Sequence, residues 1–246
     1  MKAAPAAQLR LLDLAELDAA ADRLAHRRRT LPELAEIDEL TKQYARIVTQ
    51  VIEAETEAGD LAREQTKAEG DVDAVRQRSE RDQKRLDSGQ VTSPKDLSNL
   101  QSEITSLQRR QGDLEEIVLE IMERREAADT TVTDLVARRD EIGSTRAVLE
   151  ERRDAAFAEI DKEAGEVAGR RTDIAAEIPA DLLGLYSKLR EQYTVGAAKL
   201  SGTRCMGCKV SLSIADMNAI KRAPADEVVR CEECRRILVR TPEPGL

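Results

Sequence analysis

Apolar residues recur at alternating steps of four and three between Leu40 and Leu86, and mostly charged or amide side chains surround them. This spacing places the apolar residues on one narrow face of an α-helix, which is typical of a coiled-coil seam. Eleven of the fourteen seam positions are apolar or Tyr, and several are Ala, which lets two helices approach closely. The seam positions are Leu40, Tyr44, Ile47, Val51, Ala54, Ala58, Leu61, Gln65, Ala68, Val72, Val75, Ser79, Asp82 and Leu86.

The first seam stops at a short turn-forming segment, and a second seam begins directly after it. Gly89 interrupts the helix, and Pro94 suits the first position of the next one. A short turn between two long seams predicts an antiparallel coiled-coil hairpin with its tip at residues 88–93. The candidate site residues of the tip are Ser88, Gly89, Gln90 and Pro94. The second seam comprises Leu97, Leu100, Ile104, Leu107, Gln111, Leu114, Val118 and Ile121, and continues through Leu135, Ile142 and Leu149.

The apolar pattern changes phase near the base of both arms, which indicates a separately packed helical region there. On the first arm, Pro32 cannot continue a helix from the preceding residues, and Thr30 with Glu33 matches a capping box. We therefore expect a hairpin domain over residues 1–179, with helices at about 8–28, 31–87 and 94–178.

Three shorter segments follow the hairpin. Residues 180–198 predict a connecting helix and a linker, because Leu and Tyr recur on one side of the segment before Gly196. Residues 199–240 predict a compact module that contains all the cysteines. Residues 241–246 contain two prolines and no core residues, which predicts a disordered tail.

Composition agrees with a helical rod and argues against a pocketed enzyme. The chain of 246 residues is 35% charged and only 2% aromatic, with no Trp, so it lacks the large side chains that usually fill a globular core. At 41% hydrophobic, it nevertheless has enough apolar surface to fold. The composition therefore favours an all-α chain built around a long antiparallel coiled-coil hairpin, followed by a small C-terminal module.

The four cysteines form two Cys-x-x-Cys pairs, Cys205 with Cys208 and Cys231 with Cys234, separated by 22 residues. This pattern fits tetrahedral Cys₄ zinc, since each pair forms a knuckle that directs two thiolates at one ion. Four protein ligands leave no open position for water, so we expect one structural Zn²⁺ and no catalytic metal. The alternatives are a redox dithiol or a disulfide pair.

The residues between and after the knuckles predict a small zinc ribbon with an inserted helix. The fold class expected for the whole chain is therefore all-α with a small zinc ribbon, in which this module follows the long antiparallel coiled-coil hairpin. Ser213-Ile214-Ala215-Asp216 is typical of a helix start, and this helix runs to about Arg222 before Pro224. Two short strands are expected, Val228-Val229-Arg230 before the second pair and Ile237-Leu238-Val239-Arg240 after it.

Taken together, these features resemble a bacterial family with a long coiled-coil hairpin and a C-terminal C4-type zinc ribbon. The resemblance rests on the hairpin, on Pro94-Lys95-Asp96-Leu97 leading into Glu103-Ile104, on Leu114-Glu115-Glu116-Ile117, and on the cysteine pattern ending in Arg236-Ile237-Leu238. Arg235 stands where many members have Gly after the last Cys. The resemblance implies a non-enzymatic adaptor or regulator. Members in some bacteria are linked to an alternative sigma factor, to flagellar or type III export components, and to messenger RNA.

Charge is unevenly distributed along the chain, whose formal net charge is −9. Residues 199–240 carry nine Lys or Arg against five acids, so this module is basic before its thiolates and zinc are counted. A basic ribbon on an acidic rod makes RNA or DNA an alternative partner. The candidate binding residues for nucleic acid or another partner are Arg204, Lys209, Lys221, Arg222, Arg230, Arg235 and Arg236.

These observations predict an adaptor or regulatory protein that uses its rod and its zinc ribbon to bind protein partners, and not an enzyme. The alternative is an RNA-binding, ribosome-associated or RNA-polymerase-associated regulator that contacts phosphates through the ribbon. We expect no small-molecule substrate, no membrane association, a cytoplasmic location, and a monomer or a homodimer.

Overall fold

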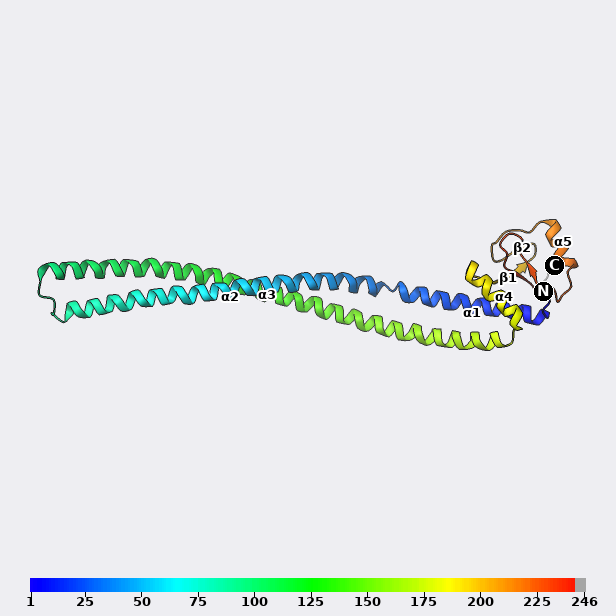
Figure 1. Ribbon diagram of the computed structural model, residues 1–246, viewed down its shortest axis with the longest axis horizontal. Coiled ribbons are helices and arrows are strands. Elements are labelled where there is room, and N and C mark those ends of the chain that lie inside the picture. Colours follow the sequence, from blue (N-terminus) through cyan, green and yellow to red (C-terminus); the bar gives the residue numbers. More distant parts are fainter. Residues whose placement is uncertain (242–246) are drawn as a thin grey trace. The chain divides into compact units, whose positions relative to one another are not determined.

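The computed structural model describes residues 1–241, and it confirms a mostly helical chain that ends in a small strand region with four cysteines (Figure 1). The expected tail thus lies outside the described residues from 242 onward. No helix in residues 1–241 is both long enough and apolar enough to cross a bilayer. The helices are α1 (Pro5–Arg29), α2 (Pro32–Asp87), α3 (Pro94–Ala176), α4 (Ala180–Tyr193) and α5 (Ile214–Arg222), and the strands are β1 (Ala197–Ser201), β2 (Arg204–Cys205), β3 (Val229–Arg230) and β4 (Ile237–Arg240).

The chain divides into two compact units. The first, which we call the hairpin unit, is Ala35–Glu150 and contains most of α2 and the first part of α3. The second, the ribbon unit, combines Met1–Leu34 with the chain from Glu151 onward. The divisions fall close to the positions where the apolar pattern changes phase along the two arms.

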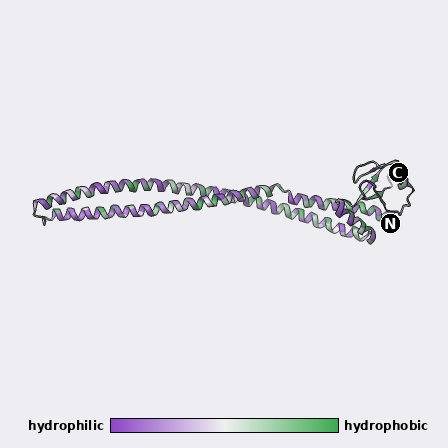
Figure 2. Ribbon diagram, turned by 45° about the horizontal axis from the view of Figure 1, so that its top comes forward, coloured by the Kyte–Doolittle hydropathy of each residue, from purple (hydrophilic) through white to green (hydrophobic). Residues whose placement is uncertain are grey.

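Within the hairpin unit, the two helices bury a thin seam. Hydrophilic residues dominate both helices, and hydrophobic residues recur along them at intervals (Figure 2). The seam is narrow because only every third or fourth residue of each helix faces the other. Its buried apolar members are Ile47, Val51, Ala54, Leu61 and Ala68 from α2, and Leu100, Ile104, Ile121 and Leu149 from α3.

The hairpin tip joins α2 to α3 through the glycine that the sequence marks as a helix breaker. Gly89 has a φ of +68°, a left-handed conformation that glycine adopts without steric cost. The Ser88 hydroxyl donates to the Arg85 carbonyl at 2.9 Å and closes the last turn of α2. Pro94 occupies the first position of α3, and Gln90 is exposed.

The predicted capping box at Thr30 and Glu33 is wrong. The Thr30 hydroxyl donates to the His26 carbonyl at 2.9 Å, and the Thr30 backbone N–H donates to the same carbonyl. Thr30 therefore caps the C-terminal end of α1 and does not begin the next helix. The second helix starts only at Pro32, whose ring presets the backbone for a first helical position. Glu33 then lies in the first turn of α2, where the helix dipole favours an acid.

In the ribbon unit, the sheet and the helices α1 and α4 share one core. Leu11 and Leu14 of α1, Tyr186 of α4, and Ile237 and Val239 of β4 are all fully buried in the same cluster. The sequence pattern does not predict this sharing, because it places the two ends of the chain in separate segments.

The sheet has four strands in the order β2-β1-β4-β3. Strands β3 and β4 match the two expected strands, and β1 is an additional central strand that runs parallel to β4. The approach of β1 to α4 requires Gly196, since a Cβ at this position would lie 2.5 Å from the Tyr186 carbonyl oxygen. Ala197 and Ala198, which the sequence assigns to the linker, therefore belong to the sheet.

The first residues of the chain also pair with the ribbon. The Ala3 N–H donates to the Asp226 carbonyl at 2.7 Å, and the Val228 N–H donates to the Met1 carbonyl at 3.0 Å. The buried Gln8 side chain supports this pairing by donating to the Ala3 carbonyl at 2.8 Å. The first turn of α1 is thus tied to the loop before β3.

Candidate zinc centre

The four cysteine sulfurs converge on one point of the ribbon unit. All four Sγ atoms lie within 4.8 Å of one another. Cys205 and Cys234 are 3.8 Å apart between their sulfurs, and Cys208 and Cys231 are 3.9 Å apart. A tetrahedron with Zn–S bonds of about 2.3 Å separates its sulfurs by about 3.8 Å. The donor set therefore fits one structural Zn²⁺ bound by all four cysteines.

The two knuckles have the same backbone geometry. The Lys209 N–H donates to the Cys205 carbonyl at 2.7 Å, and the Arg235 N–H donates to the Cys231 carbonyl at 2.8 Å. The N–H groups of Cys205 and Cys231 in turn donate to the carbonyls five residues ahead, at 3.1 and 3.0 Å. Lys209 and Arg235 both have a φ of 62°. Each knuckle thus ends in a left-handed residue that turns the chain back beside its first cysteine.

Burial of the site opposes ionisation of two thiols in the absence of metal. It raises the pKa of the Cys205 thiol, and it raises that of Cys231 to about 12. Burial acts in the same direction on Cys234, but hydrogen bonds from the Arg236 backbone and from neighbouring thiols outweigh it and lower the pKa of that group. A zinc ion would stabilise thiolates at positions where burial alone favours thiols.

A small apolar cluster surrounds the metal ligands. Cys205 and Cys231 are buried together with Leu200 and Leu238 from the sheet and Met217 from α5. The helix start that the sequence predicts at Ser213 is the start of α5. A capping box fixes it, in which the Ser213 hydroxyl accepts from the Asp216 N–H at 3.1 Å. This cluster is small, so metal ligation supplements it in holding the ribbon together.

Most of the basic candidate residues lie on the surface of the ribbon, but two of them donate to backbone carbonyls. The exposed Arg230 donates from its Nε to the Arg235 carbonyl at 2.8 Å. Arg236 is half-buried, and its guanidinium donates to the carbonyls of Val195 at 3.0 Å and Tyr193 at 2.9 Å. It therefore links the second knuckle to the end of α4. The exposed members are Arg204, Lys209, Lys221, Arg222, Arg230 and Arg235.

Arg240, one of the nine basic residues between 199 and 240, also contacts the interior of the ribbon unit. Its guanidinium donates to five backbone carbonyls at 2.7 to 3.4 Å. These carbonyls lie at the end of α5 and in the loop that pairs with the N-terminal residues. The accepting residues are Ile220, Ala223, Pro224, Ala225 and Glu227.

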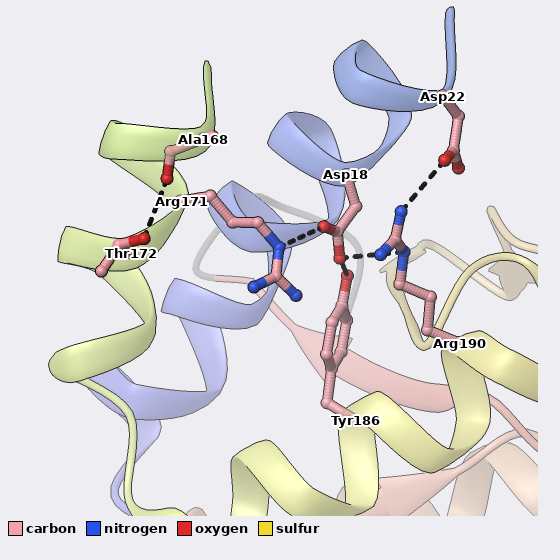
Figure 3. A network of polar contacts seen from close by, with 7 residues as sticks. All are labelled: Asp18, Asp22, Ala168, Arg171, Thr172, Tyr186 and Arg190. Atoms are coloured by element: carbon pink, nitrogen blue, oxygen red, sulfur yellow. Dashed lines mark hydrogen bonds and ion pairs between the residues drawn. The ribbon is translucent and has the colours of Figure 1, made fainter. Parts of the chain in front are cut away.

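A buried polar network, which the sequence did not reveal, joins α1, α3 and α4 (Figure 3). The Asp18 carboxylate is 3% exposed, accepts from the Tyr186 hydroxyl at 2.6 Å and pairs with Arg171 at 2.6 Å and Arg190 at 3.1 Å. Asp22 extends the network, because it pairs with Arg190 at 3.0 Å. The position of Asp18 in the sequence could have indicated its burial. It follows Leu11 and Leu14 at helical spacing and continues the buried face of α1 that they form.

The tip candidates lie in the hairpin unit, whereas the four cysteines of the zinc centre all lie in the ribbon unit. Within residues 1–241, the cysteines are the one cluster of three or more His, Cys, Asp or Glu side chains arranged to hold a metal ion.

Comparison with known proteins identifies both parts of the chain. Residues 14–194 match the family model of the CT398-like coiled coil hairpin domain, and residues 204–238 match that of the C4-type zinc ribbon domain. Two Mycobacterium tuberculosis proteins, MT2288 and Rv2229c, are each 37% identical over 240 residues, which is 98% of this chain and 98% of theirs.

Solved structures show the same fold. A protein structure from Mycobacterium smegmatis is 36% identical, with a TM-score of 0.86 over 98% of this chain and 100% of that one. CT398 from Chlamydia trachomatis is 19% identical, with a TM-score of 0.69 over 96% of this chain and 98% of its own. HP0958 from Helicobacter pylori is 16% identical, with a TM-score of 0.51 over 97% and 98% of the two chains. The chain therefore belongs to the family with the CT398-like coiled-coil hairpin domain, here followed by a C4-type zinc ribbon.

Proposed function

We propose that this protein is a non-enzymatic adaptor whose hairpin and zinc ribbon bind different macromolecules. The observation that carries the proposal is the closed Cys₄ centre in one unit and a long, thin hairpin in the other. A zinc ion held by four cysteines has no open position for a substrate. A two-helix hairpin offers a long surface relative to its small core, which suits protein binding.

Site-specific photo-crosslinking of the full chain in cells tests the adaptor function. The photoreactive residue replaces Gln90 at the tip or Lys209 in the first knuckle, both of which are exposed. The matched control is the exposed Arg138 of α3. We expect each test position to yield its own adduct, absent at the control position. Identical adduct patterns at all three positions, or none at any of them, would contradict the proposal.

A second candidate function is RNA binding through the ribbon, favoured by the exposed basic residues of that unit. Lys209, Lys221 and Arg222 make no ion pair within residues 1–241, so their charges are available for phosphates. No aromatic residue lies between 199 and 240, so base stacking would contribute little. The ribbon would therefore bind RNA mainly through its phosphates and with little dependence on the RNA sequence.

Filter binding of RNA to the zinc-loaded protein separates this candidate from the adaptor function. We expect replacement of Lys209, Lys221 and Arg222 by Glu to weaken binding and to reduce the slope of log affinity against log salt by about one for each lost phosphate contact. Arg236 is unsuitable for this test, because its loss would also disturb packing. Glu at the exposed hairpin residues Arg81, Arg109 and Arg110 provides the control. An equal effect of both triple variants would exclude a ribbon-specific site.

A further inference from the structure

Two large apolar side chains of α3 project from the hairpin unit beside its seam. Leu119 is 60% exposed and Met122 is 45% exposed, whereas the seam residue Ile121 between them along the chain is buried. The three-residue step from Leu119 to Met122 places both on one helix face. Exposed apolar residues that occur singly need no explanation, but neighbouring ones at helical spacing form a surface.

These side chains line two consecutive hollows between α2 and α3. A hollow of about 350 Å³ is lined by Val72, Val118 and Leu119, with charged residues at its rim. A second hollow of about 530 Å³ shares Leu119 and continues past Met122 to Thr133. We call these two hollows the apolar groove. From Glu115 to Thr133 the groove follows α3 for roughly 27 Å at 1.5 Å per residue.

The rim of the apolar groove is acidic. Arg76 pairs with Asp73 at 2.6 Å, and Arg125 pairs with Asp129 at 3.5 Å, so the two basic residues of the rim are already neutralised. Four other acids remain on the rim. Two of them accept hydrogen bonds from amide side chains, at 2.7 Å each, and the other two make no ion pair within residues 1–241. The four acids are Glu69 and Glu115, which accept the amides, and Glu123 and Glu126.

We propose that the apolar groove binds a basic amphipathic helix of a partner protein. This inference rests on the adaptor function proposed above and names the chemistry of a partner of the hairpin. A third helix laid along the groove would place its apolar face over Leu119 and Met122. Lys or Arg residues flanking that face would reach Glu123 and Glu126, as charges beside a coiled-coil seam do.

A second copy of this chain is a poorer occupant. In a two-fold symmetric pair, the same surface patch of each copy meets its counterpart. The acidic rim would then face an acidic rim, and the like charges would oppose association. A basic helix instead complements both the apolar floor and the charge of the rim.

Fluorescence anisotropy with the zinc-loaded full chain and designed peptides tests this inference. The probe is a labelled helical peptide of about 18 residues, the length that spans the groove, with Leu on one face and Lys on both flanks. The control peptide has Glu in place of every Lys. We expect the basic peptide to bind more tightly than the acidic one, and its binding to weaken with salt.

Two double variants show whether binding occurs in the groove. Leu119→Ser with Met122→Ser should lower the affinity for the basic peptide at least about tenfold, because central apolar contacts dominate such interfaces. These substitutions leave the net charge of the protein unchanged. Glu123→Lys with Glu126→Lys should lower the affinity for the basic peptide and make the acidic peptide the tighter ligand. Val148→Ser is the matched control, since Val148 is 48% exposed in the same unit but does not line the groove. Circular dichroism confirms that each variant keeps its helices.

Three results would overturn the inference. The first is absence of binding by the basic peptide. The second is binding that neither double variant alters, which would indicate general attraction to an acidic chain. The third is self-association that Leu119→Ser with Met122→Ser abolishes, which would make a second copy the occupant. None of these results affects the crosslinking test of the adaptor function, because that test uses the tip and the ribbon.

Discussion

The hydroxyl of Tyr186 on α4 donates a 2.6 Å hydrogen bond to the buried carboxylate of Asp18 on α1. Two residues separated by 168 positions in the chain thus meet in a buried contact within the ribbon unit, where Arg171 of α3 also pairs with Asp18. A buried carboxylate requires such partners, because an unpaired charge in the interior is costly.

Removal of the Tyr186 hydroxyl should destabilise the ribbon unit. Tyr186→Phe leaves Asp18 with one donor fewer, and a hydrogen bond to a charged group contributes about 1.5–3 kcal/mol to stability. Urea denaturation of the zinc-loaded protein measures this loss. Tyr44→Phe is the control, since the Tyr44 hydroxyl makes no hydrogen bond within residues 1–241, and it should change the free energy of unfolding by less than about 0.5 kcal/mol. Equal losses in the two variants would show that the hydrogen bond contributes nothing.

The same contact predicts a loss of stability in alkali. Burial and the hydrogen bond to Asp18 raise the pKa of Tyr186 well above its usual value of 10.0. The unfolded chain ionises this tyrosine above about pH 10, whereas the folded chain keeps it neutral, so the free energy of unfolding falls as the pH rises. Below that pH this group contributes no pH dependence.

Denaturation of the wild type and Tyr186→Phe between about pH 9 and pH 11 measures the slope. We expect a shallower decline for the variant, which has no phenol to ionise at this position. Parallel declines in the two proteins would contradict the assignment.

Zinc removal should unfold the ribbon and leave the hairpin helical. The hairpin unit has its own seam and contains none of the cysteines. Cys231→Ser with Cys234→Ser should abolish stoichiometric zinc in native mass spectrometry while most of the far-ultraviolet helical signal persists. A collapse of that signal on chelation would mean that the hairpin depends on the metal.

Replacement of Arg235 by glycine should strengthen the zinc ribbon. Arg235 has a φ of 62°, and a non-glycine residue in this conformation costs about 1 kcal/mol. Arg235→Gly relieves this cost, whereas the β-branched Arg235→Val increases it. Competition with a chromogenic chelator should rank the zinc affinities as Gly above Arg above Val. Tighter zinc binding by the wild type than by Arg235→Gly would show that the Arg235 side chain contributes more than its backbone conformation costs.

Loss of Arg240 should lower the stability of the ribbon unit more than loss of an exposed arginine. Arg240→Ala removes the donors to five carbonyls and costs about 1–3 kcal/mol. Arg222→Ala, on the exposed surface, is the matched control and should change the melting temperature little. Thermal unfolding with zinc in excess distinguishes the two.

The sequence alone determined the helical hairpin, its tip and the zinc ligands. Each depends on local spacing: a 3.5-residue apolar repeat, a Gly–Pro break between helices, and two residues between paired cysteines. The capping box at Thr30 was predicted wrongly for a related reason, since a helix boundary depends on small local energies that Pro32 was able to shift.

Only the tertiary structure decided which polar residues are internal and what the ribbon packs against. Asp18, Arg236 and Arg240 look like ordinary charged residues in the sequence, yet each has partners far along the chain or on backbone carbonyls. The pairing of Ala3 with Asp226 and the joint core of α1, α4 and β4 likewise bring distant segments together. Local spacing determines which face of an element is apolar, but contact between segments far apart in the chain depends on how those faces are finally packed.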